Sequence, residues 1–189
     1  MIAVINYGVG NVRSVLSALR RLDVEACLTA DPDQIDDADG VILPGVGAFA
    51  EAMQELRSAG LLSLLRDAGD SDRPMLGICL GLQLLFGESL EHGTHEGLGL
   101  VDGKVRRFEG DMKVPHMGWN QVSIADDCPL FEGVEDQSYF YFAHSYYVDP
   151  RSNNVVAGRT DYGTQFTSAV QQDTLFGTQF HPEKSGDCG

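Results

Sequence analysis

A short apolar run, Pro74–Ile78, stops at a Gly-x-Cys-x-Gly sequence, and apolar residues then return at helical spacing. The run is too short for a helix and suits a buried parallel strand. Beyond the glycines, Leu82, Leu85 and Phe86 fall on one helical face. This stretch therefore predicts a strand, a sharp turn at Cys79 and a helix, the repeating unit of an α/β fold.

Two earlier stretches repeat this arrangement. The expected strand Ile2–Ile5 leads into the glycine-containing turn Asn6–Asn11 and then into an amphipathic helix. The expected strand Gly40–Leu43 ends in Pro44–Gly47, and a helix begins near Ala48. Because the carboxyl ends of parallel strands meet at one edge of a sheet, a ligand is expected to bind at that edge.

The second half of the chain is rich in short strands joined by short turns. We expect a polar loop over Gly87–Gly97 and an ordered loop over Pro115–Asn120. The remaining expected strands are Ala26–Thr29, Leu98–Val101, Lys104–Phe108, Asn120–Ile124, Tyr139–Phe142, Tyr146–Val148, Val155–Ala157, Ala169–Gln171 and Leu175–Gln179.

A length of 189 residues without a linker-like segment predicts a single domain over residues 1–189. The net charge of -15 argues against nucleic acid as a partner, because no cationic face would meet the phosphates. No apolar run approaches membrane-spanning length, and residues 1–5 suit a strand better than a signal peptide. We therefore expect a cytoplasmic protein whose four well-separated cysteines are reduced thiols.

Cys79 has two interpretations. A thiol at a strand-to-helix turn lies near helix amides whose dipoles favour the thiolate, the nucleophilic form. A free cysteine is more often a small buried hydrophobic residue, and the turn by itself favours that reading. Catalysis by Cys79 would also require a base and a group that orients the base.

The sequence Phe180-His-Pro-Glu183 supplies both missing groups. Pro182 biases His181 toward an extended conformation, in which residues two apart point to the same side. Glu183 can then orient the imidazole, fix its tautomer and stabilise its charged form. Together with Cys79, these residues form a candidate triad for a thiol hydrolase, and they leave open which acyl group it attacks.

Two other patterns are weaker. Gly8-x-Gly10 has Arg13 where a dinucleotide-binding turn needs its third glycine, so we interpret it as a structural turn. His92 and His95 lie in the polar loop without further ligands at a metal-binding spacing, so we expect them to be solvated. Neither a metal nor a cofactor is expected.

At these residues the chain resembles the class I glutamine amidotransferases. Among the class I enzymes, it is similar to the family of glutaminase subunits of imidazole glycerol phosphate synthase. The resemblance runs from the first strand to Ser185, and it implies a flavodoxin-like, three-layer, doubly wound α/β sheet with a strand-rich second half. The motifs that carry it are Asn6–Asn11, Pro44–Phe49, Gly77–Phe86, Pro115–Asn120, Tyr141–Tyr146 and Phe180–Ser185.

The resemblance implies hydrolysis of L-glutamine to glutamate and ammonia. Cys79 would form a glutamyl thioester, His181 would act as base and then as acid, and Glu183 would orient His181. Backbone amides would meet the oxyanion, and a second set of residues would hold the substrate. The oxyanion group is Leu80, Gly45, Val46 and Gly47, and the substrate group is Gln83 and Glu91 with the backbone of Ser145 and Tyr146.

The family also implies a partner, a (β/α)8-barrel cyclase subunit that receives the ammonia through a tunnel and uses it in histidine biosynthesis. The two subunits would form a heterodimer. The residues expected to face this partner are Asn11, Pro115, His116, Met117, Trp119, Asn120, Tyr141 and Lys184.

One departure from the family concerns the carboxyl-terminal end. The family continues past His-Pro-Glu-Lys-Ser into a terminal helix, whereas this sequence ends at Gly186–Gly189. We expect that helix to be absent and apolar sheet surface to be exposed in its place.

Two alternative functions remain open. The first is the glutaminase subunit of another synthase, such as pyridoxal phosphate synthase, and the sequences Pro44–Gly47 and Ile78–Leu80 argue against it. The second is a non-catalytic regulatory subunit that keeps the fold. The presence of Cys79, His181 and Glu183 argues against that second reading.

Overall fold

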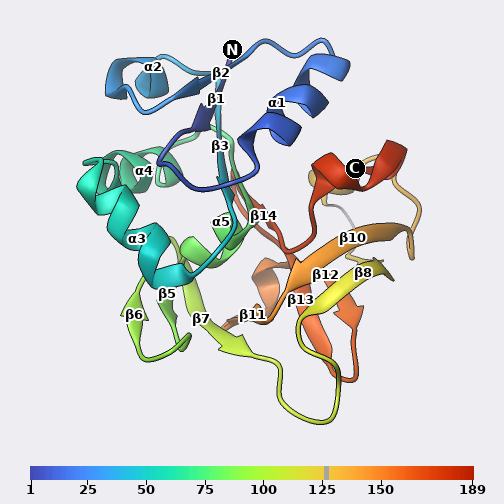
Figure 1. Cartoon of the computed structure of the whole chain (residues 1–189). Coiled ribbons are helices and arrows are strands. Elements are labelled where there is room, and N and C mark those ends of the chain that lie inside the picture. Colours follow the sequence, from blue (N-terminus) through green and yellow to red (C-terminus); the bar gives the residue numbers. More distant parts are fainter. Residues whose placement is uncertain (126–127) are drawn as a thin grey trace.

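A mixed sheet of twelve strands forms the centre of the computed structural model, which describes residues 1–125 and 128–189 (Figure 1). Most of its strands follow one spatial order, while β12 pairs with β13 beside this path and β9 pairs with β12. In that order they are β2 (Ala26–Thr29), β1 (Ile2–Ile5), β3 (Gly40–Gly45), β4 (Met75–Cys79), β14 (Leu175–Thr178), β13 (Gln165–Gln172), β11 (Tyr146–Pro150), β7 (Val101–Arg107), β5 (Phe86–Ser89) and β6 (His95–Glu96), with β12 (Val156–Asp161) and β9 (Ser123–Ile124) to the side.

The first five strands in this order, β2 to β14, are parallel, and helices cover both of their faces (Figure 1). The helices are α1 (Val12–Arg21), α2 (Pro32–Asp36), α3 (Phe49–Ser58), α4 (Leu62–Gly69) and α5 (Leu80–Leu84). Val4 and Ile42 face α1 and share a core cluster with its Val15. Ala3 and Leu43 point to the opposite face, where α3, α4 and α5 supply the apolar side chains. This alternation produces the three layers that we predicted.

The strand-rich second half adds a smaller sheet of β8 (His116–Gln121) and β10 (Tyr139–His144). A mostly aromatic core fills the space between this pair and the main sheet. Within that core Phe140 and Phe180 stack with ring centroids 4.2 Å apart. Because Phe180 directly precedes His181, this packing helps to hold His181 beside β10, where its N–H donates to the carbonyl oxygen of Tyr141.

Three sequence predictions of secondary structure were wrong. Helix α5 ends at Leu84, and Phe86 begins β5 instead of lying on the helix. The expected loop Gly87–Gly97 therefore contains most of β5 and all of β6. The strand expected from Leu98 starts at Val101. The physical reason is tertiary pairing, because Phe86 pairs with Val101 across β5 and β7.

The segment Pro115–Asn120 requires a further correction, since it was expected to be a loop and is mostly strand β8. Its residues pair in antiparallel register with β10, from His116 opposite His144 to Gln121 opposite Tyr139. This pairing depends on a strand that begins only at Tyr139, beyond the reach of local pattern, so local sequence carried little sign of it.

After His181 the chain forms two single-turn 3-10 helices, Pro182–Lys184 and Gly186–Cys188. A pocket of about 210 Å³ lies beside them, lined largely by apolar residues that include Leu19, Ile78 and Phe180. Ile78 and Phe180 in this lining are buried, so they do not form the exposed apolar sheet surface that we expected near this end. Within the described residues, no helix combines the length and the apolar character that crossing a membrane requires.

Candidate active site

Cys79 is the last residue of β4 and adopts a backbone conformation that side chains rarely occupy, with φ 55° and ψ -107°. Two glycines allow the tight turn around it. A Cβ on Gly77 would lie 2.8 Å from the backbone of Gly81, and a Cβ on Gly81 would lie 1.8 Å from the carbonyl oxygen of Leu43. The predicted sharp turn is confirmed, and it holds a thiol at the carboxyl edge of the parallel strands.

His181 and Glu183 face one another as their spacing predicted. Nδ1 of His181 lies 2.8 Å from Oε1 of Glu183, and both side chains are almost fully buried. The backbone also holds His181, because its N–H donates to the carbonyl oxygen of Tyr141 at 2.9 Å. The hydroxyl of Ser185 donates to the carbonyl oxygen of His181. The carboxylate of Glu183 therefore orients the imidazole, and two hydrogen bonds hold the backbone of His181.

The electrostatic environment favours the charged form of His181. Burial by itself lowers the pKa of this imidazole, but hydrogen bonds with Cys79 and Glu183, together with their charges, raise it to about 9. The influence of Cys79 on this pKa reflects an imidazole that lies close to the thiol, although the two residues lie 102 positions apart in the sequence. A thiol, an imidazole and a carboxylate thus meet at one place, which is the arrangement that nucleophilic catalysis requires.

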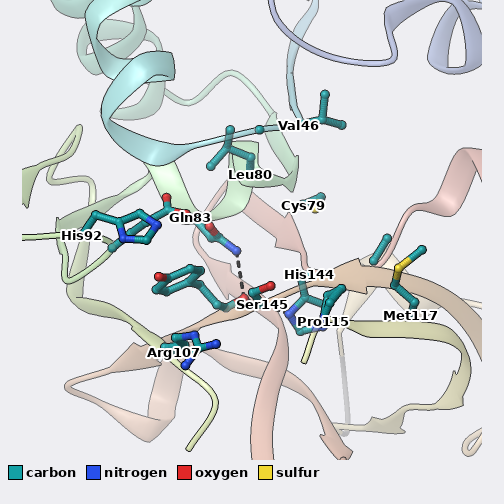
Figure 2. Close-up of a pocket in the computed structure, with 14 residues that line it drawn as sticks. Val46, Cys79, Leu80, Gln83, His92, Arg107, Pro115, Met117, His144 and Ser145 are labelled. Carbon is teal, nitrogen blue, oxygen red and sulfur yellow. Dashed lines mark hydrogen bonds between the residues drawn. The ribbon is translucent and has the colours of Figure 1, made fainter. Parts of the chain in front are cut away.

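A pocket of about 410 Å³ opens over Cys79 (Figure 2). Figure 2 shows Val46 and Leu80 on one side of the pocket and Ser145 and Arg107 on the other. The pocket collects most of the residues that the sequence predicted for the oxyanion and the substrate. Those in its lining are Val46, Gly47, Cys79, Leu80, Gln83, Glu91, Ser145 and Tyr146.

The glycine-rich turn after β3 lies directly beside the nucleophile, because Gly45 pairs with Cys79 in the sheet register. The buried hydroxyl of Tyr7 donates to the carbonyl oxygen of Pro44 at 2.7 Å and anchors the start of this turn. Val46 is 39% exposed at the pocket edge, and Gly47 has a φ of 98°, which a glycine adopts readily. Gly45 itself lies outside the pocket lining.

Gln83 and Glu91 reach the pocket with part of their hydrogen-bonding capacity already used. Nε2 of Gln83 donates to the carbonyl oxygen of Tyr146 at 3.0 Å and to Gln179 at 3.1 Å, so its free polar atom is Oε1. Oε2 of Glu91 accepts the N–H of Phe49 at 2.6 Å, at the start of α3, where no side chain of the helix itself provides a cap.

A group of aromatic, apolar and basic side chains extends from Met117, which lines the pocket. Met117 is 65% exposed and Trp119 is 55% exposed. The ring of Tyr141 lies edge-on to Trp119 at 6.2 Å, and the ammonium of Lys184 lies 5.8 Å from the centre of the Tyr141 ring. We call Met117, Trp119, Tyr141 and Lys184 the rim patch.

One residue predicted to face the partner does not reach the surface. His116 is 3% exposed, and its Nδ1 lies 3.1 Å from Nε2 of His144. The reason is that residues 116–121 form a strand, so alternate side chains turn into the core. Asn120 is half-buried and donates to the carbonyl oxygen of Asp161 at 2.8 Å, while Pro115 is exposed and Asn11 is half-buried beside α1.

Three residues near the site were missed by reasoning from the sequence. Arg107 and His144 line the pocket, and Gln179 is fully buried with its Nε2 3.7 Å from Sγ of Cys79. Arg107 and His144 carry no local signal. Gln179 does carry one, because it is a polar residue at the end of an apolar strand, two positions before His181. Among residues 1–125 and 128–189, no group of three or more metal-ligating side chains is placed to hold an ion.

Comparison with known proteins agrees with this geometry. The family model described as glutamine amidotransferase class-I matches residues 3–188. The chain is 51% identical over its whole length to the imidazole glycerol phosphate synthase subunit HisH of Methanothermobacter thermautotrophicus, covering 93% of that protein. It is 52% identical to the protein of the same name from Moorella thermoacetica, again over its whole length and covering 90% of that protein.

Solved structures show the same fold. A crystal structure of a glutamine amidotransferase superimposes with a TM-score of 0.79 at 20% identity, covering 100% of this chain and 94% of the other. The PurLQS structure from Thermotoga maritima superimposes with a TM-score of 0.75 at 20% identity, covering 96% and 87%. The chain therefore belongs to the class I glutamine amidotransferases, within the family of imidazole glycerol phosphate synthase HisH subunits.

Proposed function

We propose that this chain hydrolyses L-glutamine to L-glutamate and ammonia, with Cys79, His181 and Glu183 as its catalytic residues, and that the ammonia serves imidazole glycerol phosphate synthesis. One observation carries the proposal. The strained turn presents Cys79 to a pocket and, at the same time, to an imidazole that Glu183 orients at 2.8 Å. A buried structural cysteine would need neither the pocket nor the oriented imidazole.

The reaction follows from these positions in two halves. In the first, the thiolate of Cys79 attacks the side-chain carbonyl carbon of glutamine, and a C–S bond forms. The C–N bond then breaks as the imidazolium of His181 gives its proton to the leaving ammonia. In the second half, neutral His181 takes a proton from water, the resulting hydroxide attacks the thioester, and the C–S bond breaks to release glutamate. Glu183 stabilises the charged imidazole throughout.

The pocket residues suit the polar groups of glutamine. The carboxylate of Glu91 accepts hydrogen bonds and attracts the α-ammonium group, while Oε1 of Gln83 remains available as an acceptor. Backbone N–H groups at Ser145 and Tyr146 would receive the α-carboxylate. The amide of Leu80 and an amide from the turn formed by Gly45, Val46 and Gly47 would stabilise the oxyanion.

The relatives are named as subunits of imidazole glycerol phosphate synthase, which supports a cyclase subunit as partner. We place that partner on the rim patch, because its Met117 and Trp119 are exposed apolar side chains and Met117 also lines the pocket from which ammonia must leave. The rim patch is linked to the triad, since the carbonyl oxygen of its Tyr141 holds the N–H of His181. Residues 1–189 would then act as one glutaminase domain in a cytoplasmic heterodimer.

The test measures ammonia release from glutamine by the chain alone and with the cyclase subunit and its nucleotide ligand. We expect low activity alone and strong stimulation in the complex, because an uncoupled glutaminase would waste glutamine. Cys79→Ser should abolish ammonia release, and the matched control Cys188→Ser, which alters an exposed thiol, should leave it unchanged. Full activity of Cys79→Ser would refute the assignment, and equal rates with and without the cyclase would refute the coupling.

A further inference from the structure

Gln179 is a fully buried amide next to the nucleophile, and the reaction outlined above assigns it no task. It follows the last residue of β14, and its backbone N–H donates to the carbonyl oxygen of Ser168 at 2.8 Å. Burying a side-chain amide costs free energy unless its polar atoms find partners. Both do so in the active site, because Oε1 meets Gln83 at 3.1 Å and Nε2 lies 3.7 Å from Sγ of Cys79.

The hydrogen-bond network itself decides which way these two amides point. The carbonyl oxygen of Tyr146 can only accept, so the atom of Gln83 that lies 3.0 Å from it must be the NH2 group. The same NH2 group faces Gln179, which must therefore present its oxygen to Gln83. The remaining atom of Gln179 is its NH2 group, and it faces the sulfur of Cys79.

We propose that Gln179 stabilises the thiolate of Cys79 by donating an N–H to its sulfur and, through its oxygen, positions Gln83 for the substrate. The inference rests on the proposed function, in which Cys79 is the nucleophile. A donor that binds the charged form of a group favours that form, and a buried hydrogen bond is screened little by water.

Gln179 complements His181 because the two donors differ in kind. The imidazolium of His181, whose pKa the neighbouring Cys79 and Glu183 raise, interacts with the sulfur as an acid that loses its proton through catalysis and at high pH. The amide of Gln179 keeps its N–H at every pH at which the protein is folded. The thiolate therefore has one fixed donor both before it attacks glutamine and when the C–S bond of the thioester breaks to release it again.

Two isosteric substitutions separate the two tasks. Gln179→Glu keeps an oxygen for the NH2 group of Gln83 but presents a carboxylate oxygen to the sulfur in place of N–H. Gln179→Met removes both contacts at similar volume. The probe is iodoacetamide, which reacts with the thiolate, and mass spectrometry of the peptide that carries Cys79 distinguishes this thiol from Cys27, Cys128 and Cys188.

We expect both variants to move the midpoint of the pH profile of Cys79 alkylation upward by about one pH unit or more. For glutamine hydrolysis in the presence of the cyclase, Gln179→Glu should lower kcat by roughly tenfold with little change in KM, whereas Gln179→Met should also raise KM. Ser168→Ala is the matched control, because Ser168 is equally buried on the neighbouring strand and its hydroxyl has no partner among the described residues.

The outcomes separate this inference from the proposed function. If Cys79→Ser is inactive but both Gln179 variants keep the parental alkylation profile, the thiolate role of Gln179 is wrong and the triad stands. If Cys79→Ser remains active, the proposed function fails first. A shift of the profile in Ser168→Ala as large as in the Gln179 variants would also overturn the inference, because any disturbance of β13 and β14 would then produce it.

Discussion

At the scale of single residues, the site depends on backbone strain held in place by its surroundings. A positive φ on a residue other than glycine costs about 1–3 kcal/mol, and Cys79 adopts a φ of 55°. The conformation persists because β3 and β14 pair with β4 on either side and leave the turn no room to relax. The strain has a use, since it points the thiol into the pocket and toward His181.

The raised pKa of His181 predicts the pH dependence of hydrolysis. In the proposed reaction the imidazolium donates the proton to ammonia, so kcat/KM should fall as the pH rises through about 9, where His181 loses that proton. Glu183→Gln removes the negative charge that stabilises the imidazolium and should move this alkaline limb to lower pH. A pH profile of kcat/KM for both proteins measures the effect. An unchanged alkaline limb in Glu183→Gln would mean that His181 is not the acid.

At the scale of elements, the site is built where α5 packs closely against β3. Gly81 on α5 touches the backbone of β3 so closely that a Cβ would lie 1.8 Å from the carbonyl oxygen of Leu43. This contact sets the distance between the glycine-rich turn and Cys79, because the turn leaves β3 and the cysteine precedes α5. The two elements therefore position the nucleophile and the candidate oxyanion group together.

Gly81→Ala tests this packing. The added methyl group meets backbone rather than a movable side chain, so we expect a loss of stability of about 3 kcal/mol or more and loss of ammonia release. Thermal unfolding and the glutaminase assay measure both effects. Gly87→Ala is the control, since its Cβ would meet the carbonyl oxygen of Gly103 at an ordinary 3.6 Å. A Gly81→Ala protein with the parental melting temperature and activity would contradict the role assigned to this contact.

At the scale of the whole molecule, the proposed catalytic residues and the rim patch come from neighbouring strands. The main sheet supplies Cys79 from β4 and leads to His181 after β14, while β8 and β10 supply Met117, Trp119 and Tyr141 of the rim patch. A hydrogen bond of 2.9 Å from the N–H of His181 to the carbonyl oxygen of Tyr141 joins the two regions. Binding of a partner at the rim patch can therefore act directly on the position of His181.

Trp119→Ala tests the rim patch. An exposed tryptophan at the centre of an interface commonly contributes about 2 kcal/mol or more, so the affinity for the cyclase should fall by more than about tenfold. Titration calorimetry measures this affinity, and ammonia release at saturating cyclase should recover. The control is Leu22→Ala, because Leu22 is 70% exposed at the end of α1, outside the rim patch. Equal affinities for Trp119→Ala and the parent chain would move the interface elsewhere.

The sequence by itself determined the parallel α/β core, the turn at Cys79 and the pairing of His181 with Glu183. Each of these depends on neighbours a few residues apart, such as the glycines beside Cys79 or the proline after His181, and short-range sterics act in the same way wherever the segment lies. The family motifs added the remaining candidate residues, most of which line one pocket.

Only the tertiary structure decided which of the distant residues meet. It made Phe86 the start of a strand by pairing it with Val101, and it turned His116 into the core by pairing residues 116–121 with β10. It also brought Gln179 to the sulfur of Cys79 across 100 positions of sequence. The physical reason is that strand pairing and the satisfaction of buried polar groups are settled between segments far apart in the chain, which no local pattern records.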